Sequence, residues 1–460
     1  MQCVHRTITM TKNPNSRKFK KRTGKVDLST NCAGIKSPNP FWLASAPPSN
    51  SGEQVMRAFD HGWGGAVWKT LGDGDPVINV TSRYGAIDIG GQKIAGLNNV
   101  ELITDRPLEV NLKEIAEVKK KYPKHAVIVS LMVPCERKNW HDIVKKAEDT
   151  GCDGLELNFG CPHGMSERGM GAAVGQVPEY IEKVVGYVKE VAKTPVLTKL
   201  TPNISDIRFP ARAAKAGNTD GISLINTINS VMGIDLDTMK PKFAIGGKGA
   251  HGGYCGPAVK PIALNMVSQI AADPETKNIP ISGIGGISDW RDAAEFMLLG
   301  SSSVQVCTAV MHYGFRIVED MISGMENWMR KNDFETLDDF IGKSSSDIYE
   351  WKHLNLHHKT VAKIDPEKCI ECDLCYIACN DTAHQCIVRP VDYGTKGPKS
   401  KIATVIEEDC VGCNLCSLVC PVEECITMTE VDTGHEPLTW EQYTANGMKG
   451  YKEVYKRFHD

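Results

Sequence analysis

One pattern recurs along the chain between residues 40 and 310: a short apolar run, a polar or glycine-rich turn, and a stretch with helical periodicity. The apolar runs are rich in β-branched residues and nearly continuous, which is typical of parallel strands covered on both faces. They lie at 40–46, 65–71, 126–132, 154–160, 195–201, 221–227, 279–286 and 302–308. Helical patterns at 108–122, 140–151, 179–192, 210–217, 261–272 and 289–300 separate most of them. Eight such units over about 270 residues favour a (β/α)8 TIM barrel over an open, doubly wound sheet.

Polar side chains end most of these predicted strands, although strands of this kind are otherwise apolar. In a (β/α)8 barrel the carboxyl ends of all strands meet on one face, where active sites lie. We therefore expect an active site at that face. The polar residues that close the runs are Ser45, Lys69, Thr70, Asn158, Lys199, Thr201, Asn226, Thr227 and Thr308.

The chain divides further by composition. Residues 1–24 are polar and basic and are predicted to form a solvated, mobile arm. The barrel is expected to occupy 25–335, and a linker is expected at 336–362. A small α+β domain rich in cysteine is predicted over 363–430, and a polar tail over 431–460.

Composition narrows the classes of function. With 41% hydrophobic and 24% charged residues, the 460-residue chain is typical of a soluble globular protein. A net charge of −3 gives no general reason to expect nucleic acid or an acidic membrane as a partner. Neither a membrane-spanning run nor a signal-peptide pattern is found, so a cytoplasmic location is expected. In a reducing compartment the 17 cysteines predict metal binding or catalysis rather than disulfides.

Two cysteine runs, at 369–379 and 410–420, share the spacing C-x2-C-x2-C-x3-C. This is the spacing of bacterial ferredoxins with two [4Fe–4S] clusters, in which the fourth cysteine of each run binds the other cluster. A zinc ribbon needs only two C-x2-C pairs, which these runs oversupply. Asn380 stands where the second run has Pro421, but proline is not a ligand. One cluster is therefore predicted on Cys369, Cys372, Cys375 and Cys420, and the other on Cys410, Cys413, Cys416 and Cys379.

The segment 156–176, which follows the fourth predicted strand, is the densest motif of the barrel. Its glycines and Pro162 exclude a continuous helix, so a loop must present Cys161 at the barrel mouth. Asn158, His163, Glu167 and Arg168 surround this cysteine in sequence. A thiol in such polar surroundings at a strand end is a candidate proton donor or acceptor, rather than an inert core cysteine.

Glycine-rich turns follow the seventh and eighth predicted strands, where barrels of this kind commonly bind phosphate. Gly285, Gly286, Thr308 and Ala309 are positioned to do so through backbone N–H groups. A second pattern, G-x-G-x-x-G at 247–252, neither follows a clear strand nor opens a helix, and lacks the acidic residue of a dinucleotide site. We predict a flexible loop over the barrel mouth there, and no NAD site in the chain.

The strings NFGCPHGMSERGMG (158–171), KLTPN (199–203), INT (225–227) and SGIGGIS (282–288) resemble dihydropyrimidine dehydrogenase, from about residue 26 to about 428. The match is to the barrel-plus-ferredoxin subunit of the bacterial two-subunit enzyme. The resemblance implies FMN in the barrel, two [4Fe–4S] clusters, and reduction of uracil or thymine to the 5,6-dihydro form.

The resemblance also implies roles for individual residues. Cys161 would exchange the proton at C5 of the pyrimidine, and Lys199 would stabilise negative charge near the flavin. The implied pyrimidine contacts are Asn99, Asn158, Phe159, Gly160, Asn226 and Thr227. The implied FMN contacts are Ala44 or Ser45, Lys69, Thr70, Lys199, Gly256, Gly285, Gly286, Ile287, Thr308 and Ala309. The family often has Leu-Ser in place of Phe159-Gly160, so these two positions would contribute backbone contacts only.

Two alternatives are weighed against this interpretation. A dihydroorotate dehydrogenase would share the barrel and FMN, but that family commonly has asparagine where this chain has His163. A non-catalytic electron-transfer subunit would not need the polar strand ends. Because no NAD site is predicted, we expect a partner subunit that binds NAD(P)H and FAD, in a heterotetramer with two copies of each chain.

Overall fold

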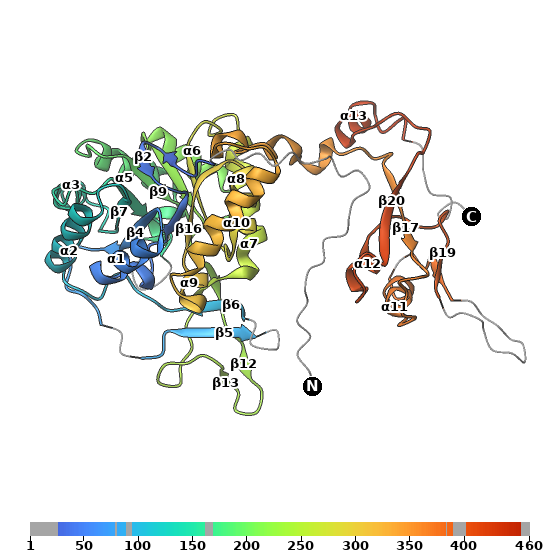
Figure 1. Ribbon diagram of the computed structural model, residues 1–460, viewed down its shortest axis with the longest axis horizontal. Coiled ribbons are helices and arrows are strands. Elements are labelled where there is room, and N and C mark those ends of the chain that lie inside the picture. The colour runs from blue at the N-terminus through green and yellow to red at the C-terminus, as the bar shows by residue number, and fades with distance from the viewer. Residues whose placement is uncertain are drawn as a thin grey trace, which may run out of the picture. The chain divides into compact units, whose positions relative to one another are not determined.

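The computed structural model describes residues 26–78, 81–88, 94–161, 169–382, 384–389 and 402–451. The predicted basic arm at 1–24 lies outside these ranges, as do His163, Glu167 and Arg168. The chain divides into two compact units, with the boundary between Asp347 and Ile348 (Figure 1). Among the helices described, none is both long and apolar enough to cross a membrane.

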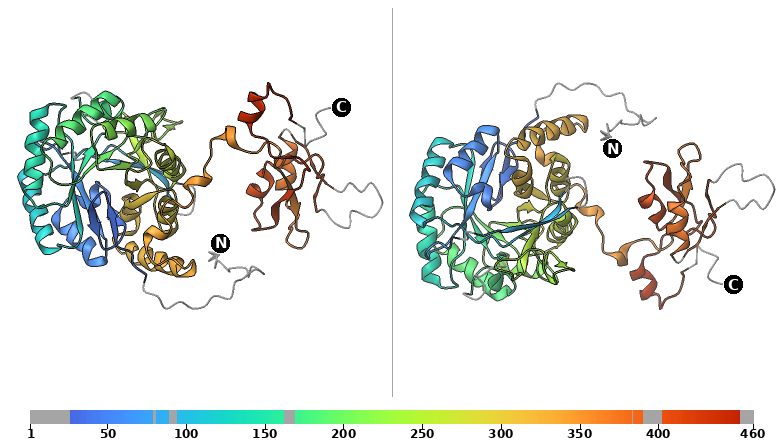
Figure 2. Two further views of the ribbon diagram at one scale, coloured as in Figure 1. Left: turned by 90° about the horizontal axis from the view of Figure 1, so that it is seen from above. Right: turned by 90° about the horizontal axis from the view of Figure 1, so that it is seen from below.

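Eight parallel strands of the first unit close into a barrel, which confirms the predicted fold (Figure 2). Each strand pairs with the next one along the chain, and the last pairs with the first. The strands are β3 (Phe41–Leu43), β4 (Gly65–Leu71), β7 (Ala126–Leu131), β8 (Gly154–Asn158), β9 (Val196–Lys199), β10 (Gly221–Leu224), β15 (Ile281–Ile284) and β16 (Ser301–Val306). Their carboxyl ends therefore lie on one face of the barrel.

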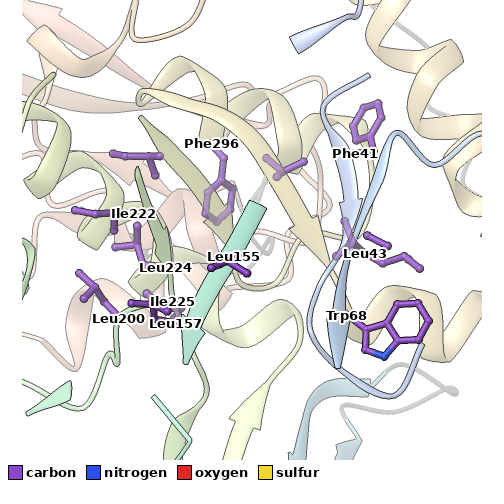
Figure 3. Packing of buried hydrophobic residues seen from close by; sticks show 14 of the residues in the cluster. Phe41, Leu43, Trp68, Leu155, Leu157, Leu200, Ile222, Leu224, Ile225 and Phe296 are labelled. Carbon is purple, nitrogen blue, oxygen red and sulfur yellow. The ribbon is translucent and has the colours of Figure 1, made fainter. Parts of the chain in front are cut away.

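Helices surround the barrel and bury the outward-facing residues of its strands. They are α1 (Gly52–His61), α2 (Leu108–Lys121), α3 (Arg137–Glu148), α4 (Ala172–Gly175), α5 (Pro178–Lys189), α6 (Arg208–Ala216), α7 (Lys260–Ala272), α8 (Trp290–Leu298), α9 (Thr308–Tyr313) and α10 (Ile317–Lys331). Short 3-10 helices lie at Pro47–Ser49, Pro257–Val259, Leu337–Asp339, Ser345–Asp347 and Trp351–His353. Leu155, Leu224 and Phe296 belong to one large hydrophobic cluster between strands and helices (Figure 3).

The interior of the barrel differs from this outer core. Because side chains alternate along a strand, Leu155 and Leu157 of β8 join the outer cluster while Glu156 faces the other way. A smaller apolar cluster lies at the amino-terminal end of the strands, where the hairpin of β1 (Thr30–Cys32) and β2 (Ile35–Ser37) packs against Trp42. The hairpin closes that end, so access to the barrel is from the carboxyl ends.

A four-stranded antiparallel sheet, which the sequence patterns did not predict, lies at the mouth of the barrel, where its residues line the cavity at the carboxyl ends of the strands. It contains β5 (Tyr84–Asp88), β6 (Ile94–Asn99), β11 (Ile228–Ser230) and β14 (Gly252–Cys255). Two further short strands, β12 (Ile234–Asp235) and β13 (Lys240–Pro241), pair with each other. Gly252, predicted to belong to a flexible loop, begins β14 and pairs with Ser230, because Gly252–Cys255 supplies the strand between β11 and β6.

The second unit contains β17 (Lys359–Ile364), β18 (Ile387–Val388), β19 (Thr404–Val405), β20 (Ile426–Val431), α11 (Leu374–Asn380), α12 (Leu415–Val419) and α13 (Trp440–Ala445). β17, which pairs antiparallel with β20, begins at Lys359, so its first residues lie within the predicted linker 336–362. Leu337 and Phe340, at the other end of that range, are buried in the core of the first unit. The connection between the units is accordingly shorter than the composition suggested, because apolar residues near both ends of the range are buried.

Candidate active site and cluster cavities

A cavity of about 1120 Å³, counting its open mouth, lies at the carboxyl ends of the barrel strands. It brings together residues from segments far apart in the chain. The lining residues that the sequence predicted are Ala44, Ser45, Lys69, Thr70, Asn99, Asn158, Cys161, Lys199, Asn226, Thr227, Gly256, Gly285, Gly286, Ile287, Thr308 and Ala309. Phe159 and Gly160 are not among the residues that line it.

Phe159 and Gly160 have structural roles beside the cavity. The Phe159 ring is buried and packs edge-on against Trp140, with 6.2 Å between ring centroids. A Cβ atom at position 160 would lie 2.4 Å from Cβ of Asn226, so only glycine fits there without displacing that amide. These two residues shape the wall behind the site rather than its surface.

Cys161 lies just after the end of β8 and is 7% exposed. It packs with Met132 and Met170 in a small buried cluster. Its backbone carbonyl accepts a hydrogen bond from the amide of Ala172 at 3.1 Å, which ties it to the chain beyond the loop 162–168. The thiol is therefore held at the edge of the cavity by apolar neighbours and a fixed backbone.

Asparagine amides are fixed by hydrogen bonds within the cavity wall. The amide nitrogen of Asn158 donates to Oγ1 of Thr70 at 2.9 Å, and its Oδ1 accepts from the amide of Asn226 at 3.0 Å. Thr70 lies 3.1 Å from the hydroxyl of Ser45. This chain of contacts across β3, β4, β8 and the end of β10 orients two amides before a ligand arrives.

Lys199 lies over a buried carboxylate in the barrel interior. Its ammonium is 3.5 Å from Oε1 of Glu156, whose side chain has no exposed surface. The other carboxylate oxygen accepts from Ser223 at 2.8 Å and from the amide of Gln305 at 2.9 Å. Glu156 thus balances the charge of Lys199 from within the barrel interior. Lys199 and Gln305 both line the cavity.

Glu101 is a cavity residue that our reasoning from sequence missed. Its carboxylate accepts from Lys69 at 2.6 Å, from Tyr84 at 2.7 Å and from Arg83 at 3.2 Å. Burial pushes the pKa of Glu101 upward, but the hydrogen bonds and charges of these three neighbours outweigh it and lower the pKa. Glu101 lies two residues beyond the end of β6, and no sequence pattern marked that strand, so the sequence offered no clear signal for this residue.

Three glycines form a narrow wall at one side of the cavity. Gly256, Gly285 and Gly286 have φ of +97°, +129° and +74°, a region that disfavours side chains. A Cβ atom at Gly286 would lie 2.9 Å from the carbonyl oxygen of Gly256 and 2.8 Å from Cβ of Lys260. Bare backbone next to Thr308 and Ala309 is suited to a phosphate group, as the sequence predicted. The residues present therefore fit FMN.

Gly286→Ala is expected to weaken FMN binding. The collision with Gly256 and Lys260 would displace the backbone that holds the phosphate, and a loss of about 1.4 kcal/mol of binding free energy raises the dissociation constant tenfold. Flavin fluorescence titration of the FMN-free chain measures this constant. Gly314→Ala is the matched control, because Gly314 also has a positive φ of +82° but has open space where its Cβ would lie. Equal affinities in the two variants would contradict the phosphate assignment.

Two cavities in the second unit each gather one crossed set of predicted cluster ligands. The first cavity, about 390 Å³ with the space open to solvent included, is lined by Cys369, Cys372, Cys375 and Cys420. The second cavity, about 330 Å³ counted in the same way, is lined by Cys379, Cys410, Cys413 and Cys416. In the described ranges, no three His, Cys, Asp or Glu side chains converge as a single metal ion requires, so the thiols surround a space rather than a point. Four thiols around one cavity are the ligand set of a [4Fe–4S] cluster.

Two protein-family models match the chain, one in each of its two units. Residues 27–329 match the family model of dihydroorotate dehydrogenase, and residues 362–428 match that of the 4Fe-4S dicluster domain. FMN is the cofactor of the first family, and the second model indicates two iron–sulfur clusters.

Individual relatives sharpen the assignment. The NAD-dependent dihydropyrimidine dehydrogenase subunit PreA of Escherichia coli is 41% identical over 360 residues, which cover 78% of this chain and 87% of that protein. The chloroplastic dihydropyrimidine dehydrogenase (NADP(+)) of Arabidopsis thaliana is 44% identical, covering 69% and 77%. The catalytic subunit of dihydroorotate dehydrogenase B (NAD(+)) of Pyrococcus abyssi is 36% identical, covering 68% and 98%. The chain therefore belongs to the dihydroorotate dehydrogenase family and, within it, to the dihydropyrimidine dehydrogenases that carry a 4Fe–4S dicluster domain.

Proposed function

We propose that the chain is the pyrimidine-reducing subunit of a dihydropyrimidine dehydrogenase, an oxidoreductase that acts on a CH–CH bond. Its reaction would be the reversible conversion of uracil or thymine to the 5,6-dihydro form. The observation that carries the proposal is the single cavity that joins Cys161, Lys199, fixed asparagine amides and a glycine wall. The similarity to dihydropyrimidine dehydrogenases supports the same reaction.

The cavity offers separate groups for cofactor and substrate. Gly256, Gly285, Gly286, Thr308 and Ala309 would hold the FMN phosphate, while Lys199 would lie near the flavin ring and stabilise developing negative charge. When bound, FMN supplies the hydride that adds to C6 of the pyrimidine. The remaining predicted FMN contacts, from Ala44, Ser45, Lys69, Thr70 and Ile287, line the same cavity.

Asparagine amides suit a pyrimidine ring because they match its alternating carbonyl and N–H groups. Asn158 and Asn226 each donate an amide hydrogen to a protein acceptor, Thr70 and Asn158 respectively. An amide group has two such hydrogens, so one from each remains for a ring carbonyl. Asn99 and Thr227 would complete the contacts.

Cys161 would transfer the proton. Reduction adds a hydride to C6 and a proton to C5 across the ring double bond, so a proton donor is needed on the C5 side. The Cys161 thiol would give this proton, and the resulting thiolate would take one up before the next turnover. The apolar neighbours Met132 and Met170 exclude water from its side.

Reduction of the protein by a dihydropyrimidine tests the function directly. We expect the purified chain to show flavin absorbance and to be reduced, flavin and clusters together, by dihydrouracil under anaerobic conditions. Dihydroorotate serves as the comparison substrate, because it would be preferred by a dihydroorotate dehydrogenase. Reduction by neither compound would favour a non-catalytic electron-transfer subunit.

Electrons would reach the chain from a partner subunit that binds NAD(P)H and FAD, and we propose a heterotetramer with two copies of each. The G-x-G-x-x-G pattern at 247–252 supports the need for a partner, because it leads into strand β14 rather than opening a helix. Co-purification with a flavoprotein that confers NAD(P)H-dependent uracil reduction is the expected result. A chain that oxidises NAD(P)H without a partner would contradict this part of the proposal.

The crossed ligand sets predict how pairs of cysteine substitutions combine. Cys420→Ala is expected to remove one cluster and about half of the iron, since each cluster takes four cysteines. Adding Cys372→Ala should remove no more, because both residues line the first cavity. Adding Cys413→Ala instead should remove nearly all the iron, because Cys413 lines the second cavity. Iron analysis and EPR measure the outcome, and the opposite pattern would show that each run holds its own cluster.

A further inference from the structure

Each cluster cavity contains one cysteine more than a cluster needs. Cys425 lines the first cavity and Cys386 lines the second, and both are buried, with 2% and 4% of their surface exposed. The backbone shows that they occupy equivalent places. Each directly precedes a strand, β20 or β18, and follows a residue with positive φ, Glu424 at 55° or Gln385 at 45°.

The loops that contain the first three cysteines of each run, 369–375 and 410–416, are equivalent in the same way. Glu371 and Gly412 have φ of 58° and 68°, and Asp373 and Asn414 have φ of 63° and 66° at the start of α11 and α12. The two halves of the unit therefore share a backbone conformation at these positions and differ there in side chains. The two cavities can be compared position by position.

The equivalent positions differ in charge. Glu371 and Asp373 line the first cavity, whereas Gly412 and Asn414 line the second. Arg389 lies 3.0 Å from Asp373 and offsets part of the difference. Negative charge beside a cluster disfavours the extra electron of the reduced state, so it lowers the reduction potential in the first cavity.

Hydrogen-bond donors differ in the same direction. In the second cavity, Sγ of Cys386 lies 3.5 Å from Sγ of the predicted ligand Cys379. Nδ1 of His384, which lines the same cavity, is buried and has no hydrogen-bond partner among the described residues. In the first cavity, Cys425 likewise has the predicted ligand Cys420 as a hydrogen-bond partner and also contacts the backbone carbonyl of Asp365 at 3.8 Å, but no described histidine lines that cavity. Donors that point at cluster or ligand sulfur favour the reduced state.

We infer that the two clusters are unequal: the cluster of the second cavity has the higher reduction potential, because His384 donates a hydrogen bond toward its sulfurs without a counterpart in the first cavity and no carboxylates stand at positions 412 and 414. Cys386 and His384 are positioning groups of the cluster environment and not ligands. The inference rests on the proposed ligand sets, and not on the pyrimidine chemistry.

EPR-monitored redox titration of the full chain, with iron analysis, tests it. Two midpoint potentials are expected, and Cys386→Ala should lower only the higher one while the iron content stays unchanged. His384→Leu should shift the same potential in the same direction. Cys425→Ala is the matched comparison, expected to lower only the lower potential, because its partner Cys420 belongs to the ligand set of the first cavity. Glu371→Gln should raise the lower potential.

Three results would overturn the inference. Loss of half the iron in Cys386→Ala would make that residue a ligand. Unchanged potentials in both Cys386→Ala and His384→Leu would remove the donors' role, and two coincident midpoint potentials in the unaltered chain would remove the asymmetry. If Cys386→Ala does not assemble its clusters, Cys386→Ser, which keeps a donor, should retain the wild-type potential. His384→Leu then decides whether the donors raise the potential of the second cluster. None of these measurements uses a pyrimidine, so they stand apart from the assay of the proposed function.

Discussion

Cys161→Ala is expected to lose most pyrimidine reduction, about 10²- to 10⁴-fold in turnover, the usual contribution of a positioned proton donor. FMN should stay bound and coloured, because the glycine wall that would hold it is formed by other segments of the chain. Steady-state uracil reduction with the partner subunit, or anaerobic oxidation of dihydrouracil by the chain alone, measures the loss.

A buried cysteine away from the cavity provides the control. Cys152 precedes β8 at the opposite end of the strand and is 5% exposed, so Cys152→Ala removes a thiol of similar burial. We expect that variant to retain its turnover and to lose only some stability. Near-normal uracil reduction by Cys161→Ala would exclude the proposed role of its thiol.

Glu156→Leu is expected to cause the largest loss of stability, about 3–5 kcal/mol, the usual cost of removing one partner of a buried ion pair. The change leaves the ammonium of Lys199 uncompensated, 3.5 Å from where the carboxylate was. It also leaves Ser223 and Gln305 without the acceptor that they share. Urea denaturation followed by circular dichroism, with excess FMN throughout, measures the change in the free energy of unfolding.

A double variant separates the charge from the packing. Glu156→Leu combined with Lys199→Met removes both charges, and replacing a buried pair by apolar groups is often neutral or stabilising. The double variant should therefore recover much of the stability that the single variant loses. If instead the two losses add, Glu156 acts through its hydrogen bonds to Ser223 and Gln305, and the ion pair contributes little.

The barrel could be predicted because the strands are nearly continuous apolar runs. The interior residues Glu156 and Gln305 interrupt these runs only singly, so the eight strands remained recognisable in the sequence. Predicted ends differed from the structure by a few residues: the run at 221–227 contains β10, which ends at Leu224. Asn226 and Thr227 nevertheless line the cavity, because the chain continues along the barrel mouth beyond the strand.

The antiparallel sheet could not be predicted from the same signal. Its strands β11 and β14 have three and four residues, too few for an alternating pattern, and they pair across distant parts of the chain. Tertiary contacts, rather than local sequence, decide that such segments are strands. Glu101 was missed for a related reason, since its place in the cavity depends on how this sheet carries β6 to the barrel mouth.

The duplicated backbone of the second unit limits how its two halves can exchange residues. Glycine and asparagine accept a left-handed backbone easily, so Glu371→Gly and Asp373→Asn would copy the second half into the first without changing the chain path. The reverse exchange is blocked at one point, because a Cβ atom at Gly412 would lie 2.3 Å from the hydroxyl of Thr360. At this loop position substitution between the halves is therefore possible in one direction only: the first half can take the glycine of the second, but the second cannot take the glutamate of the first.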